Sequence, residues 1–272
     1  MKIRLPILVI LMSFLDWQLL ASKEKLVQSY QLSSYAYTGY AWSKSSNVTN
    51  PDPTIFATVS SNDTDHGGLS NSPFSGVSLQ YNFCDWCSCG FSYEMYALWS
   101  YQRYHINGNP QQELSSGDYL RQFLMNHQAA QIEGYLKLPR RYQLVIKNFL
   151  NVTPLIGAGM GVGISNLFNF GTIAKKGSSS SEINYVTVGS DYINKSFAWH
   201  LEAGLKFSSL DSNFSFGLAY RYYDGGNFTS GTRYQINGET GIASLDSVLI
   251  LPGWSGNVVA NELKLYVEFD FN

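Results

Sequence analysis

Residues 262–271 read ELKLYVEFDF, and this stretch indicates the fold. The odd positions from 263 to 271 hold leucine, valine and phenylalanine, whereas Glu262, Lys264, Glu268 and Asp270 stand between them. Successive side chains of a β-strand point to opposite faces. The segment therefore predicts a strand with one apolar and one charged face. A half-buried strand of a soluble protein shares this pattern, so the rest of the chain must decide where the apolar face points.

The same alternation recurs in other segments. A first, whose facing is ambiguous, spans about 35–42, and the others span 77–83, 91–101, 132–138, 152–164, 197–207 and 214–222. A charge on the lipid face costs about 2–4 kcal/mol for Arg or Lys at mid-membrane. No apolar-phase position is charged, whereas the opposite phase, expected to face the lumen, carries Glu94, Glu133, Lys137, Glu202, Lys206, Arg221, Glu262, Lys264 and Glu268. The residues expected to face lipid include Trp199, Leu201, Leu218, Tyr220, Leu265, Val267, Phe269 and Phe271.

Composition supports a membrane barrel. Charged residues make up 14% of the chain, against about 25% in an ordinary soluble domain. Aromatic residues reach 15%, yet the mean hydropathy is −0.12, which argues against a bundle of membrane helices. No run of 18 or more apolar residues follows residue 22. A membrane protein of this kind must be a closed barrel, because hydrocarbon tolerates no unpaired strand edge. The net charge of −2 gives no electrostatic case for nucleic acid.

The N-terminal segment predicts export. Lys2 and Arg4 precede an apolar stretch at 5–15, and Leu19-Leu20-Ala21 offers a cleavage site. We therefore expect a signal peptide at 1–21 and a barrel domain at 22–272. The alternative is an uncleaved helical anchor. The location expected from this organisation is the outer membrane of a Gram-negative bacterium.

The spacing of the segments predicts an up-and-down topology. Long gaps at about 43–75, 104–129, 166–195 and 225–259 alternate with short ones at about 84–90, 147–151 and 209–213. Outer-membrane barrels have long extracellular loops and short periplasmic turns. The fold class predicted is all-β, a transmembrane antiparallel barrel of about eight strands. Residues 184–189 and 248–251 could extend or add strands, which leaves ten strands open.

At this point the sequence resembles a known family. The stretch NVTPLIGAGMGVGISN at 151–166 resembles the fifth strand of small opacity-type (OmpA/OmpX-like) outer-membrane barrels. The stretches FAWHLEAGLKF at 197–207 and FGLAYRYYD at 216–224 resemble the sixth and seventh strands of that family. The C-terminal strand resembles the signal that the barrel-insertion machinery reads, although the chain ends Phe271-Asn272. The resemblance implies an eight-stranded barrel with a surface-exposed, adhesive or structural role, and no single ligand.

The inward phase predicts a filled, ion-paired lumen. Eight-stranded barrels have interiors just wide enough to be filled by side chains. Arg221 is expected to pair with Glu202, Glu262 or Glu268, since buried charges must be paired. Glycines at 157, 159, 161 and 163 would leave room for long side chains from facing strands. His200 is expected to face the lumen beside Glu202. A narrow pore or gate is the alternative interpretation of the same residues.

Three cysteines lie together in the sequence CDWCSC at 84–89. In an oxidising periplasm, a disulfide such as Cys84–Cys87 with a spare thiol is favoured over three free thiols. Zinc is the least favoured alternative, because no fourth ligand is evident nearby. No metal, cofactor or catalytic residue is expected.

The function expected from the sequence lies in the extracellular loops, because binding sites commonly occupy loops on a rigid scaffold. Expected partners are the lipid bilayer, the insertion machinery and a host or surface ligand. Two alternatives stay open: a narrow-channel porin for small solutes, and an outer-membrane lipid-modifying enzyme. The enzyme would need a nucleophile in register with a histidine such as His200, and none is identifiable.

Overall fold

The computed structural model describes residues 31–43, 46–49, 69–106, 117–139, 142–146, 150–175, 183–189, 191–209, 213–231, 233–235, 249–251 and 255–271. The segment predicted to be a signal peptide, 1–21, lies outside the described residues. Within the described ranges, no helix is long and apolar enough to cross a membrane.

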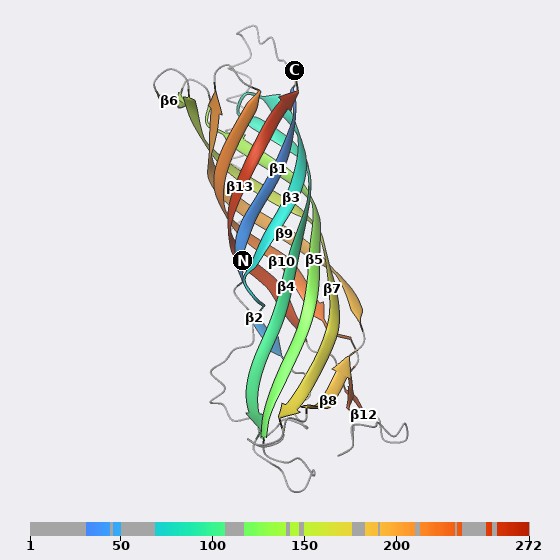
Figure 1. Ribbon diagram of the computed structural model, residues 1–272. Helices are drawn as coiled ribbons and strands as arrows, with labels where there is room; N and C mark the ends of the chain where they lie inside the picture. Colours follow the sequence, from blue (N-terminus) through green and yellow to red (C-terminus); the bar gives the residue numbers. More distant parts are fainter. Residues whose placement is uncertain are drawn as a thin grey trace, which may run out of the picture. The chain divides into compact units, whose positions relative to one another are not determined.

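Eight strands close into an antiparallel barrel (Figure 1). They are β1 (Gln31–Ser43), β3 (Ser72–Cys84), β4 (Cys87–Ile106), β5 (Gly117–Lys137), β7 (Leu150–Lys175), β9 (Tyr192–Ser209), β10 (Phe214–Thr229) and β13 (Ser255–Phe271). Each pairs with its neighbours in chain order, and β13 pairs with β1 from Leu32↔Phe271 to Ser43↔Ala260. This confirms the predicted eight-stranded up-and-down barrel.

The strands are staggered around the barrel. When cross-strand partners are followed from Tyr35 around the barrel, the path arrives on β1 about ten residues away from Tyr35. Strands tilted by about 40° to the barrel axis require such a stagger. On β10, the outward side chains from Phe214 to Tyr222 are apolar or aromatic. At roughly 3.3 Å per residue and this tilt, the eight steps of that run rise roughly 20 Å, close to the height of a membrane barrel's apolar band, which is about 25 Å. We call this outer apolar zone the belt.

Within the belt, apolar side chains face outward and polar ones inward. Leu218, Tyr220, Leu265 and Val267 are exposed on the outer face, while Arg221 is fully buried inside. Leu201 and Phe271 are likewise exposed, and Trp199 and Phe269 are half-buried. The structure gives the facing of β1, which the sequence left ambiguous. Tyr37 and Ala41 are buried in the lumen, while Tyr40 and Trp42 are on the outside.

Towards the ends of the long strands, the chemistry of the two faces is reversed. On β5, Asn126 and Gln128 point outward, while Phe123 and Met125 are buried inside. The inward residues at this level are predominantly apolar; we call them the apolar cap: Leu98, Phe123, Met125, Leu167, Phe228 and Val258. The reversal occurs because the strands at this level are surrounded by water and no longer by lipid. There the apolar side chains are buried inside, as they are in a soluble barrel.

The predicted long loops were therefore too long. β4 continues to Ile106 and β5 already begins at Gly117, so most of 104–129 is strand. Likewise β7 and β9 take up much of 166–195, and β10 and β13 take up both ends of 225–259. The prediction depended on outward apolar residues, and this signal ends at the edge of the belt while the strands go on. For the same reason β4 and β10 continue beyond Trp99 and Tyr222.

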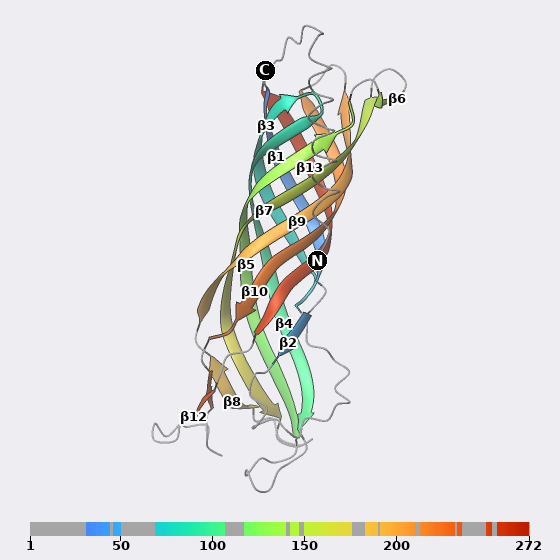
Figure 2. The same ribbon diagram turned by 180° about the vertical axis from the view of Figure 1, so that it is seen from behind.

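Beyond the belt, part of the barrel opens into a curved wall (Figures 1 and 2). β8 (Ile183–Gly189) pairs with the end of β7, β11 (Arg233–Gln235) pairs with β8, and β12 (Leu249–Leu251) pairs with β11. β2 (Ser46–Thr49) pairs with β13. The candidate strands at 184–189 and 248–251 thus extend this wall and do not enlarge the barrel. We call β8, β11, β12 and the ends of β4, β5 and β7 the extracellular wall, because the long connections mark that side.

The other end has short connections and carries the C-terminal residues of β13 (Figure 1). The β3–β4 turn consists of Asp85 and Trp86, so it is tighter than the predicted 84–90. β6 (Leu144–Ile146) pairs with β7 at 150–152, which corrects the predicted turn at 147–151. The strand signal of β6 was missed because three residues are too few for alternation to be recognised.

The assigned facing predicts that an arginine is tolerated on the outer surface only beyond the belt. Leu265→Arg should lower the free energy of unfolding by about 2–4 kcal/mol, because it places a cation in lipid. Asn227→Arg, on the outer face of β10 beyond the belt, should change it by less than about 0.5 kcal/mol. Urea unfolding from lipid vesicles measures both. Equal losses for the two variants would contradict the position of the belt.

Candidate functional site

Arg221 lies at the centre of a buried network of ion pairs and hydrogen bonds in the lumen. Its side chain is fully buried, and Nη2 lies 2.7 Å from Glu94 Oε2 while Nε lies 2.5 Å from Glu262 Oε2. Nη2 also donates a hydrogen bond to the hydroxyl of Tyr96 at 2.7 Å. Glu262 is on the neighbouring strand β13, but Glu94 and Tyr96 are on β4, which does not pair with β10. This ion triad therefore ties separate parts of the barrel wall together through the lumen.

Aromatic rings fill the space beside the triad. The guanidinium carbon of Arg221 lies 5.0 Å from the ring centroid of Phe74 and 5.5 Å from that of Tyr223. Tyr96 stacks on both rings, with centroid distances of 5.3 Å to Phe74 and 5.2 Å to Tyr223. Such contacts add cation–π attraction to the charge pairing. Ions and rings together occupy this level of the barrel.

A second charged level lies on the periplasmic side of the triad. Lys264 Nζ is 2.9 Å from Glu202 Oε2 and 3.3 Å from the hydroxyl of Tyr135. The same ammonium lies 4.4 Å from the ring centroid of Tyr37. Glu202 is thus paired with Lys264 and not with Arg221, although Arg221 and Glu202 are direct cross-strand neighbours.

Glu133 is stabilised by hydrogen bonds from neutral side chains, in contrast to the ion-paired carboxylates. Its Oε2 accepts hydrogen bonds from Ser78 at 3.1 Å, Gln80 at 3.0 Å and Tyr135 at 3.1 Å. The side chain is 1% exposed, and no described lysine or arginine forms an ion pair with it. Three neutral donors around a carboxylate replace part of the hydration that burial removes.

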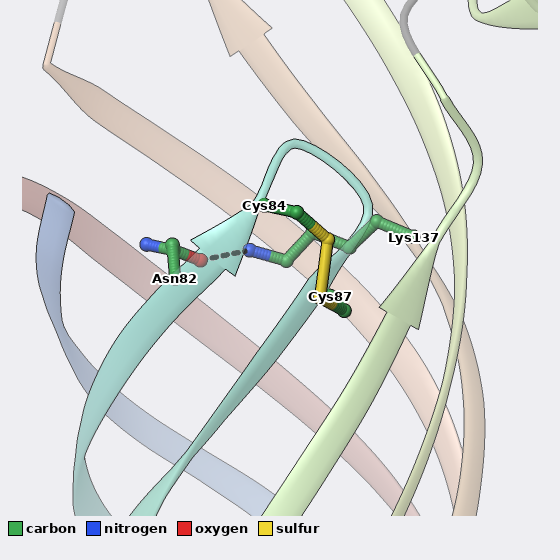
Figure 3. Close-up of a disulfide and its surroundings, with 4 residues drawn as sticks. All are labelled: Asn82, Cys84, Cys87 and Lys137. Carbon is green, nitrogen blue, oxygen red and sulfur yellow. Dashed lines mark hydrogen bonds between the residues drawn. A yellow bond between two sulfur atoms is a disulfide. The ribbon is translucent and has the colours of Figure 1, made fainter. Parts of the chain in front are cut away.

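A third charged level closes the periplasmic end. Glu268 lies 2.6 Å from Lys206 Nζ and 3.7 Å from Lys137 Nζ, and it accepts a hydrogen bond of 2.7 Å from the Tyr35 hydroxyl. Lys137 also donates to Asn82 Oδ1 at 3.1 Å (Figure 3). Four strands, β1, β5, β9 and β13, thus meet at one carboxylate.

Two of the histidines whose side chains the structure describes face the lumen at other levels. His127 bridges the Ser165 hydroxyl, 2.8 Å from Nδ1, and the Tyr223 hydroxyl, 2.6 Å from Nε2. His200 Nδ1 lies 2.5 Å from Gln131 Oε1. Both rings are buried. Among the side chains that the structure describes, no group of three or more His, Cys, Asp or Glu is arranged to hold a metal ion.

The structure places all ten predicted lumen residues on the inner face. Eight are buried, and Lys137 and Lys206 are half-buried. Of the partners considered for Arg221, Glu262 is in contact, while Glu202 and Glu268 bind lysines. The contact with Glu94 was not foreseen, because cross-strand reasoning reaches only adjacent strands. The lumen aromatics were also missed, although they share the phase of the charges: Tyr37, Tyr96, Tyr135 and Tyr223.

Glycines make room for these rings. A Cβ atom at Gly217 would lie 2.1 Å from the ring of Tyr266, and one at Gly157 would lie 2.5 Å from the ring of Tyr135. The glycine on one strand therefore permits the tyrosine on its neighbour to lie flat against the wall. At Gly226 the reason is different: φ is +80°, and the register between β10 and β13 shifts there in a β-bulge.

A disulfide joins Cys84 to Cys87 across the β3–β4 turn, and Cys89 is free (Figure 3). Cys84 and Cys87 are paired residues of the hairpin, so the cross-link closes a turn that hydrogen bonding already forms. Cys89 follows two residues later on the same face of β4 as Cys87.

No protein-family model matches this sequence, and no curated protein matches it. Among solved structures, Neisserial surface protein A has 15% identity and a TM-score of 0.34, over 89% of this chain and 97% of that chain. The outer membrane protein OprG from Pseudomonas aeruginosa has 14% identity and a TM-score of 0.42, over 89% and 95%. Ail, the attachment invasion locus protein of Yersinia pestis, has 14% identity and a TM-score of 0.30, over 89% and 99%.

The class of this protein follows from its own barrel. An even number of antiparallel strands closes on itself, with an apolar belt outside and paired charges inside. This arrangement defines an outer-membrane β-barrel protein. With eight strands, the fold is that of the small OmpA/OmpX-like barrels, as the sequence at 151–224 indicated.

Removing the central cation should strongly destabilise the barrel. Arg221→Met leaves Glu94 and Glu262 buried without a counter-charge, so we expect a loss of about 3–5 kcal/mol of unfolding free energy. The triple variant Arg221→Met, Glu94→Gln, Glu262→Gln removes all three charges and should recover most of that loss. Urea unfolding monitored by tryptophan fluorescence gives both values. A triple variant no more stable than the single one would show that the charges are not coupled.

The cysteines give a second test. Mass spectrometry of unreduced protein should show one internal disulfide and one alkylatable thiol. Cys89→Ser should remove the thiol and retain the disulfide, whereas Cys84→Ser should abolish the Cys84–Cys87 cross-link. Three alkylatable thiols in protein exported to the periplasm would contradict the pairing.

Proposed function

We propose that this protein is a non-conducting barrel that presents its extracellular wall and loops to partners outside the cell. The observation that carries the proposal is the division of the interior. Three charged levels, centred on Glu268, Lys264 and Arg221, are followed by the apolar cap. A hydrated ion that crosses this barrel would have to displace the ion pairs and then pass an apolar layer.

The extracellular side supplies the surface for binding. β4, β5 and β7 are 20, 21 and 26 residues long, about twice the 9–11 residues that crossing a bilayer needs. The additional pairing to β8, β11 and β12 keeps this part in a sheet. A rigid sheet that carries loops is a suitable scaffold for adhesion or surface recognition.

A narrow channel is the second candidate, because the lumen at the level of the belt is polar along its length. It requires the triad and the apolar cap to move aside. A lipid-modifying enzyme has less support. Ser165 and His127 are in contact, but their side chains are 1% and 0% exposed, and the second nitrogen of His127 is bound to Tyr223.

A shortened hairpin tests the proposal. Tyr101 and Gln122 are paired residues of β4 and β5, so replacing 102–121 by Asn-Gly should close the hairpin with a two-residue turn. The barrel should still migrate faster before boiling on an SDS gel. Adherence of bacteria that carry the variant to host cells should fall to the level of bacteria lacking the protein.

Single-channel recording of the refolded protein distinguishes the alternatives. We expect no steady conductance for the full chain or for the shortened variant. Steady conductance of the full chain would support the porin and refute the proposal. Unchanged adherence of the shortened variant would show that this part of the wall does not bind.

A further inference from the structure

Among the buried lumen carboxylates that the structure describes, Glu133 is the one without an ion pair. Gly90 on β4 is the cross-strand partner of both Glu133 on β5 and Gln80 on β3. Because glycine has no side chain, Gln80 and Glu133 meet over it, with Gln80 Nε2 3.0 Å from Glu133 Oε2. All three neutral donors bond to Oε2, whereas Oε1 of Glu133 has no hydrogen-bond partner among the described side chains.

Other oxygen atoms in this part of the lumen are unpaired as well. The amide oxygen of Gln80 and Oε1 of Glu94 have no hydrogen-bond partner in the described part of the chain, and both side chains are 0% exposed. Ser92 and Glu94 occupy the next two inward positions of β4 after Gly90. The Ser92 side chain lies beside Glu133 and beside Tyr37, and the Tyr37 hydroxyl donates to Glu94 Oε2 at 3.4 Å.

The charges at this level do not balance. The levels centred on Arg221 and Lys264 hold two cations and four carboxylates, namely Glu94, Glu133, Glu202 and Glu262. Four carboxylates against two cations leave an excess of two negative charges. Lys264 attracts the charge of Glu133, but Glu202 and Glu94 repel it.

Enclosure makes this excess unfavourable. The level of Glu268 closes the lumen on the periplasmic side, and the apolar cap closes it on the other. Counter-ions from the bulk solvent therefore do not screen these carboxylates, and buried charges need partners inside the protein. Either protons or an enclosed cation must compensate the two charges.

The unpaired atoms point to the type of cation. They are oxygens of carboxylate and amide groups, with a hydroxyl beside them, and oxygen ligands of this kind suit hard cations. One divalent ion equals the excess of two charges. Magnesium requires a near-ideal octahedron and keeps several of its waters, whereas calcium accepts six to eight carboxylate, amide and water oxygens in flexible geometry. An irregular set of side-chain oxygens from three strands therefore favours calcium.

We propose that the lumen of this barrel binds one calcium ion between Glu133 and Glu94. The amide oxygen of Gln80 and the hydroxyl of Ser92 are neutral ligands, and water completes the coordination shell. The ion joins β3, β4 and β5 from within and balances the two excess carboxylates. It enters while the barrel closes and then stays enclosed. This site is independent of any partner that the extracellular loops bind.

The ligands do not form a sequence motif, because they come one or two at a time from three strands. The site also has only two carboxylates, so it differs from a cluster of three or more acidic, histidine or cysteine ligands, of which the described residues contain none. The closed barrel brings the ligands together: Gly90 leaves the space over which Gln80 and Glu133 meet.

The test measures calcium in the full-length protein refolded in calcium-containing buffer at neutral pH. Gel filtration into calcium-free buffer removes the free ion, and native mass spectrometry then counts the bound ions. We expect about one calcium ion per wild-type barrel. Glu133→Gln keeps the shape of the side chain but removes its charge, and it should lower the occupancy at least about fivefold.

Glu268→Gln is the matched control. It removes another buried carboxylate by the same substitution, but at the periplasmic level, where two lysines and not a metal ion pair with it. Its calcium content should stay within about twofold of the wild-type value. Each variant must show the heat-dependent gel shift of a folded barrel before its calcium is counted.

Calcium in the wild type and in Glu268→Gln, with little in Glu133→Gln, supports the proposal. A wild-type barrel without calcium overturns it and means that protons compensate the carboxylates. Equal calcium contents of Glu133→Gln and the wild type, or equal losses in Glu133→Gln and Glu268→Gln, overturn it too. If Glu133→Gln does not fold, Gln80→Met removes a neutral ligand instead, and wild-type occupancy in that variant also overturns the proposal.

Discussion

The structure depends on one constraint: no backbone N–H or C=O group can remain unpaired in hydrocarbon. For this chain the constraint is met by the pairing of β1 with β13, which closes the last pair of edges. Closure divides every strand into an outward and an inward phase, and the solvent on each side then selects the residues. The belt, the charged lumen and the apolar cap are all consequences of that division.

The lumen illustrates what closure demands of the side chains. A charge enclosed in the barrel loses hydration and must recover it from a partner. Arg221 is paired with two carboxylates from different walls, and Glu268 is paired with two lysines. Glu133 is surrounded by neutral donors instead. Because contacts such as that of Arg221 with Glu94 cross the lumen, they join strands that share no backbone hydrogen bond, and they specify which walls face each other.

Period-two alternation predicted the eight barrel strands and, for all but the first, their facing within the belt, because hydrocarbon selects every second residue there. It could not predict β4 beyond Trp99 or β5 before Leu124, since outside the lipid the outward residues become polar and the signal disappears. The Arg221–Glu262 pair was within reach of cross-strand reasoning, but Arg221–Glu94 depends on the diameter and stagger of the closed barrel. The sequence CDWCSC does not by itself show which two cysteines form the disulfide. The two-residue turn decides it, because it brings Cys84 opposite Cys87.

The reversal along β5 gives the interior two chemically different layers. On the periplasmic side of Ala129, the inward residues Gln131 and Glu133 belong to the polar lumen, and on the other side Met125 and Phe123 belong to the cap. Breaking the ion triad alone would still leave apolar side chains across the path, and loosening the cap would leave the charged levels. Opening such a lumen requires two chemically different layers to yield together. Substitutions on the outer face of the strands leave both layers intact, because the side chains of the two faces alternate along each strand.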